Sequence, residues 1–173
     1  MTGKLYQELQ PKHHLYYQQG DAVPDRTSRL QEMLRERRER EALDRIRTQL
    51  AGIFAGRGLP SEQVPAWVID TVRGFWFMSA EPAAVLSDDA ATETLDAWIE
   101  ESLARHGISG GFYVMSQLEL LPWLECEVPE RDWMSRIREA LDNAWVFLSL
   151  SLDVVVAVSE QEYDYQLFVG TRP

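Results

Sequence analysis

One stretch decides the fold: VVVAVSEQEYDYQLFV, residues 154–169. Its first five residues are apolar and mostly β-branched, which predicts a central strand that is covered on both faces. From Tyr163 to Val169, apolar or aromatic residues occupy every second position, which predicts a strand with one face in water. A short polar connection over 159–162 joins these strands into an antiparallel hairpin, and we expect Gly170 and Pro173 to end it.

The run just before this hairpin, residues 146–152, is compatible with two structures. Leucine occupies every second position in its latter half, as in a strand. The apolar spacing from Trp133 onward would also let a helix that begins at Pro129 continue through the run. We expect the helix to end near Ala144 and a strand to follow.

Three helices are predicted upstream of the sheet. The first runs from residue 25 to about residue 55, and glycines and a proline over 56–60 end it. Its segment RERRERE, residues 35–41, is polar on all sides, so we expect this helix to project into solvent. The second helix covers residues 59–77, and the third begins at Ser87 and stops at Gly107.

The remaining segments are short. Residues 79–86 are predicted to be a loop, and residues 112–115 a strand. Residues 118–121 suit either a short helix or a continuation of that strand. Together the elements predict the α+β class, in which N-terminal helices, including one long projecting helix, pack with a C-terminal antiparallel β-sheet.

The length of 173 residues suits one domain with its own core, which we place at residues 25–173 after an N-terminal arm over 1–24. The arm is polar but carries scattered leucines and tyrosines, so we expect it to dock on its own domain or on a partner. The arm or the long helix would also be the contact of a homodimer. His13-His14 within the arm is not accompanied by a metal-binding spacing and is interpreted as a solvated or stacking pair.

Composition and charge limit the compartment and the partner. The single cysteine, Cys126, excludes an intrachain disulfide, and the N-terminus lacks a signal-peptide core, so we expect a cytoplasmic protein without a membrane segment. The net charge is −11, and it is uneven: residues 1–58 carry +3 and residues 59–173 carry −14. An acidic body disfavours direct contact with nucleic acid and favours a basic protein partner.

The most acidic loop region covers residues 119–132. Carboxylates at alternate strand positions would suit a divalent metal, and a carboxylate pair would suit acid–base catalysis. An acidic patch with aromatic anchors would suit a partner bearing arginine or lysine, and a solvated loop with buried tryptophans is the non-functional alternative. For the partner-binding interpretation the candidate residues are Glu119, Trp123, Glu125, Glu127, Glu130 and Asp132.

The arginine-rich part of the first helix is a second candidate contact, for nucleic acid or for another protein. Neighbouring glutamates offset much of its charge, and a solvated, self-paired helix face is the structural alternative. The candidate residues are Arg35, Arg37, Arg38 and Arg40.

Catalytic motifs do not stand out in the sequence. The histidines lie in the arm and, as His106, at a predicted helix end, whereas Cys126 stands between two glutamates that would raise its pKa. No metal or cofactor is predicted. The sequence therefore favours a non-enzymatic protein-binding module, an acidic adaptor, inhibitor or immunity-like protein that recognises a basic partner. Two alternatives stay open: an accessory subunit of a nucleic-acid-processing complex, and a metal-dependent hydrolase using the carboxylates of residues 119–132.

Overall fold

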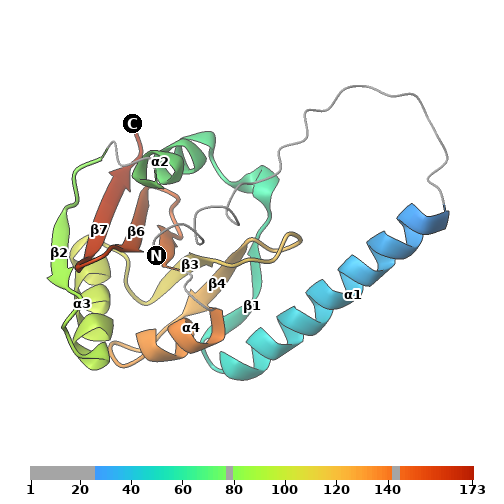
Figure 1. Ribbon diagram of the computed structural model, residues 1–173, viewed down its shortest axis with the longest axis horizontal. Helices are drawn as coiled ribbons and strands as arrows, with labels where there is room; N and C mark the ends of the chain where they lie inside the picture. The colour runs from blue at the N-terminus through green and yellow to red at the C-terminus, as the bar shows by residue number, and fades with distance from the viewer. Residues whose placement is uncertain (1–25, 77–79, 142–144) are drawn as a thin grey trace. The chain divides into compact units, whose positions relative to one another are not determined.

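The computed structural model describes residues 26–76, 80–141 and 145–173, and it divides the chain into two units, Met1–Leu34 and Arg35–Pro173. The described helices are α1 (Arg26–Gln49), the short 3-10 helix η1 (Ser61–Gln63), α2 (Ala66–Trp76), α3 (Thr92–Arg105) and α4 (Met134–Leu141). The described strands are β1 (Phe54–Leu59), β2 (Ala84–Ser87), β3 (Gly111–Met115), β4 (Trp123–Glu127), β5 (Val146–Ser149), β6 (Val154–Glu160) and β7 (Asp164–Thr171). The predicted α+β class is confirmed (Figure 1).

The described strands form one antiparallel sheet in the order β1-β4-β3-β5-β6-β7-β2. β6 lies between two partners, as its unbroken apolar sequence predicted, and its hairpin with β7 is confirmed. The strand β5 is confirmed as well, so the alternative of a helix continuing through residues 146–152 is wrong. β7 differs from the prediction in two respects: Phe168 is buried on the face expected to be in water, and Gly170 lies within the strand instead of ending it.

Gly170 lets α2 lie close to the sheet. A Cβ atom at Gly170 would overlap Cγ2 of Thr71 in α2 and would lie 3.1 Å from Cγ1 of Val155. One turn along α2, Phe75 stacks on Phe168 with the ring centroids 5.4 Å apart. This helix therefore covers the face of β7 that the alternating pattern placed in water.

The first helix is shorter than predicted. α1 ends at Gln49, and residues 54–59 form the strand β1 instead of a last helical turn. Arg136 of α4 donates from Nη2 to the carbonyl oxygens of Gln49 and Ala51, at 3.2 and 2.7 Å. These bonds satisfy carbonyl groups that the end of a helix leaves without an intrahelical partner.

The glycines expected to end this helix belong to β1. The register between β1 and β4 shifts between Phe54 and Gly58, and Gly56 has a φ of +81° within the shift. Such a conformation is easy for glycine and is typical of a β-bulge. At Gly58 a side chain would overlap the carbonyl oxygen of Trp123, so the close approach of the two strands requires glycine there.

The middle of the chain contains two strands that were not among the predicted elements, β2 and β4, and β4 lies within the region 119–132 that was expected to be a loop. Residues 79–86 were expected to be a loop, but residues 84–87 form β2 on the edge beside β7. Accordingly, α3 begins at Thr92 and not at Ser87. The segment 118–121 is neither a helix nor a strand, so both predicted structures for it are wrong.

The end of α3 follows the prediction. Gly107 has a φ of +79°, and the N–H of Ile108 donates to the carbonyl oxygen of Leu103 at 2.9 Å. The N–H of Gly107 donates to the carbonyl oxygen of Ala104 at 3.1 Å, which completes a Schellman motif. His106 occupies the C-cap position before this glycine.

The sheet carries a core on each face (Figure 1). On one face the end of α1 packs with α3, α4 and inward side chains of the strands, and Phe112 contacts Trp133 and Phe147 in this cluster. On the other face α2 packs over β6 and β7. The arm predicted over residues 1–24, with His13-His14, lies outside the described residues. Among the helices that the structure describes, none combines the length and the apolar character needed to cross a membrane.

Candidate protein-binding surfaces

The beginning of the predicted acidic region is bound to α1. The N–H groups of Glu119 and Leu120 donate to the carboxylate of Glu39 at 3.1 and 3.2 Å. The Glu119 carboxylate in turn lies 3.0 Å from Nη1 of Arg35, and both side chains are more than half exposed. The structure thus joins two residues that the sequence assigned to separate candidate sites.

Two members of the predicted set lie inside the protein. Trp123 is only 4% exposed and packs in the core cluster under α2. Glu125, also on β4, is buried and accepts bonds from Arg57 Nε at 2.7 Å and Nη2 at 2.5 Å. The paired Arg57 lowers the pKa of the Glu125 carboxyl, and burial opposes this shift only in part. Glu125 is therefore a buried carboxylate held in an ion pair, while the side chain of its partner Arg57 is largely exposed.

Besides Glu119, three members of the predicted set are exposed: Glu127, Glu130 and Asp132. The backbone around Asp132 is fixed by Glu100 of α3, whose carboxylate accepts the N–H groups of Asp132 at 3.0 Å and of Trp133 and Met134 at 2.8 Å. Asp132 itself has a φ of +63°. We call these three carboxylates the loop acidic surface. Glu100, which was not among the residues selected from the sequence, holds the Asp132 end of this surface.

The predicted arginine cluster is exposed along α1. Arg37 donates to Glu41 one turn further along the helix at 2.8 Å, and Arg35 pairs with Glu119. Among the described residues Arg38 and Arg40 take part in no ion pair. The cluster is therefore partly self-neutralised, as the alternation of Arg and Glu predicted.

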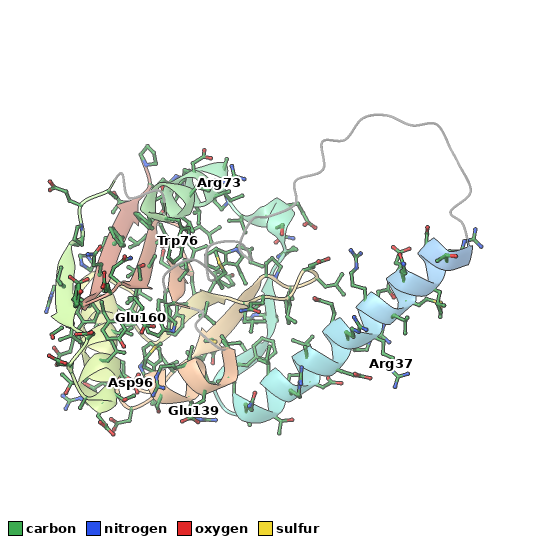
Figure 2. The ribbon with its side chains drawn as sticks, viewed as in Figure 1. Arg37, Arg73, Trp76, Asp96, Glu139 and Glu160 are labelled. Atoms are coloured by element: carbon green, nitrogen blue, oxygen red, sulfur yellow. The ribbon has the colours of Figure 1, made fainter. Side chains whose placement is uncertain are left out.

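A second group of carboxylates gathers around β2, from segments that are far apart in the sequence. Residues 80–108 contain seven acidic side chains and one arginine, and residues 153–164 contain four acidic side chains and no cation. The register of β2 with β7 places Ser87 beside Asp164, and the N–H of Asp88 donates to the carbonyl oxygen of Tyr163 at 3.2 Å. Figure 2 labels Glu160 on the side of the sheet where β2 and α3 lie.

We call this group the β2 acidic surface. Its exposed members are Asp88, Asp89, Glu93, Glu101, Glu160 and Glu162, and no ion pair within the described part of the chain includes any of them. These charges act on two neighbouring tyrosines. Burial raises the pKa of Tyr165, and the nearby charges of Glu160 and Asp88 raise it further. The bond that Tyr163 donates to Glu162, at 2.7 Å, raises the pKa of Tyr163.

A shallow groove of about 450 Å³ lies within the β2 acidic surface, between β2 and α3. Its apolar side is formed by Leu86, Ala97 and the half-buried ring of Trp98, and Glu93 and Glu101 flank it. A groove with an apolar floor and carboxylates at its margins suits a long cationic side chain, whose stem is apolar and whose end is charged. A second groove of about 260 Å³ lies between the end of α1, residues 117–118 and α4.

The β2 acidic surface was not predicted from the sequence, because its members are spread over 75 positions of the chain, from Asp88 to Glu162. The available signal was the excess of acidic residues in 80–108. Without the pairing of β2 with β7, nothing in the sequence joins that excess to Glu160 and Glu162.

The groups considered for catalysis are placed as follows. Cys126 is buried, and burial, with a smaller effect of Glu125, raises the pKa of its thiol to about 12. The described residues contain no group of three His, Cys, Asp or Glu side chains placed to hold a metal ion. Comparison with known proteins found no matching family model, no matching curated protein and no matching solved structure.

Proposed function

We propose that this chain is a non-enzymatic protein-binding module, of the adaptor, inhibitor or immunity-like kind, that recognises a basic protein. The observation that carries the proposal is the β2 acidic surface, whose carboxylates have no ion-pair partner among the described residues and two of which, Glu93 and Glu101, flank a groove with an apolar floor. Complementary charge steers association and selects the partner, while a buried aromatic or apolar contact supplies affinity. Trp98 and Leu86 offer that apolar contact.

The loop acidic surface is the second place where such a partner would bind. It keeps three of the six residues selected from the sequence in contact with solvent. The buried Trp123 and the paired Glu125 would support this surface from beneath by fixing β4. Our expectation of a reducing compartment such as the cytoplasm rests on the single cysteine of the sequence.

Self-association through α1 is a further part of the proposal. Leu30, Met33 and Leu34 form an apolar stripe at i, i+3 and i+4, and their exposed fractions are 57%, 67% and 46%. Analytical sedimentation of the wild-type chain and of Met33→Glu tests this contact, with Glu32→Lys as the control. A wild-type dimer that becomes monomeric with Met33→Glu but not with Glu32→Lys supports the contact. A monomeric wild type contradicts it.

The experiment for the main proposal is capture from native lysate, with and without nuclease, on three variants. One replaces Glu93, Glu101, Glu160 and Glu162 by Gln, and one replaces the loop carboxylates as Glu127→Gln, Glu130→Gln and Asp132→Asn. The control replaces Glu36, Glu62 and Glu81, which are exposed and take part in no ion pair of the described residues, by Gln.

We expect a basic protein to be retained with and without nuclease, in a salt-sensitive manner, and to be lost from one acidic variant but not from the control. The variant that loses capture identifies the surface. Capture that disappears on nuclease treatment would instead favour the nucleic-acid alternative and the arginines of α1. Equal capture by all variants would contradict the proposal.

A further inference from the structure

The two edges of the sheet differ in how they are protected from pairing with another strand. The edge strand β1 is interrupted by the bulge at Gly56 and carries the charged Arg57. Natural proteins use both bulges and charged side chains to prevent unwanted pairing at a sheet edge. On β2 the sequence Ala84-Val85-Leu86-Ser87 is uncharged, and its register with β7 runs without a shift. Val85 in the middle of this edge is 52% exposed.

The backbone of β2 has hydrogen-bonding groups that point away from β7. The N–H of Asp88 donates to the carbonyl oxygen of Tyr163, in the same register that pairs Ser87 with Asp164. In an antiparallel ladder, successive residues direct their backbone N–H and C=O groups alternately toward and away from the paired strand. The backbone groups of Ala84 and Leu86 therefore point toward β7, as those of Asp88 do. The backbone groups of Val85 and the N–H of Ser87 point away from β7. The Ser87 carbonyl oxygen is occupied by the N–H of Ala90 at 3.1 Å.

The side chains of an added strand would meet two different surroundings. On the α3 side they would lie over the groove, where Trp98 gives an apolar and aromatic contact and Glu93 and Glu101 supply negative charge. A lysine or arginine fits this side, because its stem packs on the ring and its cationic end reaches the carboxylates. On the opposite side they would lie beside Val85, where a β-branched residue fits.

We propose that β2 is the docking edge for an extended segment of a basic protein, which pairs with β2 as an additional strand and places lysine or arginine at alternate positions over the groove. This inference rests on the proposed function, because it names the mode in which the basic partner binds. Strand addition gives affinity through main-chain hydrogen bonds and specificity through alternate side chains.

A second copy of the chain is a poorer occupant of the same edge. A two-fold pairing of two copies of β2 would gather two β2 acidic surfaces at one interface, and β2 itself has no lysine or arginine to offset them. Collecting like charge at one interface is unfavourable, whereas a cationic strand offsets it. The charge of the β2 acidic surface therefore selects a cationic strand.

The test uses a library of random extended peptides of about ten residues, long enough to cross β2, displayed on phage and selected against the full chain. The peptides that bind are synthesised, and their affinity is measured by fluorescence polarisation. Val85→Pro removes an outward N–H and places a ring on the edge, a change that edge strands accept. Val85→Thr is the matched control, and circular dichroism with thermal unfolding verifies that both variants fold.

We expect peptides with alternating Lys or Arg that bind the wild type and Val85→Thr, and that bind Val85→Pro about tenfold more weakly or worse. N-methylation of the peptide backbone at every second residue provides a test that needs no variant. One register of methylation should abolish binding, and the other should leave it intact, because only alternate peptide N–H groups face β2.

Other outcomes separate the two proposals. Peptides that bind Val85→Pro normally but lose affinity with Glu93→Gln and Glu101→Gln would overturn strand addition and leave the acidic protein-binding function standing. Selected peptides that respond to none of these changes would overturn both. If the wild-type chain is a dimer and Val85→Pro is a monomer, the strand that pairs with β2 belongs to a second copy of the chain. That result would overturn the proposal of a cationic partner at this edge.

Discussion

The carboxylate of Glu100 in α3 accepts the backbone N–H of Trp133 at 2.8 Å, immediately before α4 begins. The same carboxylate accepts the N–H groups of Asp132 and Met134. The first N–H groups of a helix have no partner within it, and a negative charge is favourable beside them. One side chain of α3 thus caps α4 and fixes the Asp132 end of the loop acidic surface.

Replacement of Glu100 by Ala is expected to lower the free energy of unfolding by about 2 kcal/mol, because three backbone donors lose a charged acceptor. Denaturant unfolding measures the change. The neighbouring Glu101→Gln is the control, since Glu101 is exposed and makes no such bonds, and it should change stability by no more than about 0.5 kcal/mol. Equal effects of the two substitutions would contradict the capping role.

The Arg57–Glu125 pair predicts a dependence of stability on pH. The folded-state pKa of Glu125 lies below its ordinary value of 4.5, so its contribution is present above that value and is lost as the pH falls through the folded pKa. Glu125→Gln should remove this acid-limb component from unfolding curves recorded between neutral and acidic pH. An unchanged acid limb would show that the pair does not stabilise the fold.

The close approach of α2 to β7 predicts an effect at Gly170. Gly170→Ala should cost about 1–3 kcal/mol, because the new methyl group overlaps Cγ2 of Thr71. The double variant with Thr71→Ser removes that methyl group and should recover part of the loss in a double-mutant cycle measured by thermal unfolding. If the two substitutions are simply additive, the contact is not the cause.

The thiol of Cys126 should be inert in the folded protein. Its pKa of about 12 leaves little thiolate at neutral pH, and burial blocks access. A chromogenic disulfide reagent should react with it only after unfolding in denaturant, at a rate set by that unfolding. Rapid reaction of the native protein would contradict the buried placement.

Much of the fold followed from local sequence. The β-branched run of β6, the alternation that starts β7, and Gly107 after α3 each act through neighbours within a few residues. Local spacing was less informative for β1 and β2. Ile53 and Phe54 continued the apolar spacing of the first helix, although the chain turns at Gly52 before β1 begins. The strand β2 has only four residues, which is too short for an alternating pattern to identify it.

The candidate sites divide in the same way. By itself the sequence determined that the chain is acidic, has one cysteine and carries an arginine-rich helix. Only the tertiary structure decided that Glu125 is held by Arg57, 68 residues away, and that Asp88 comes to lie beside Tyr163. The physical reason is that strand pairing is long-range: register between distant segments sets which charges meet, and period and composition carry no information about it.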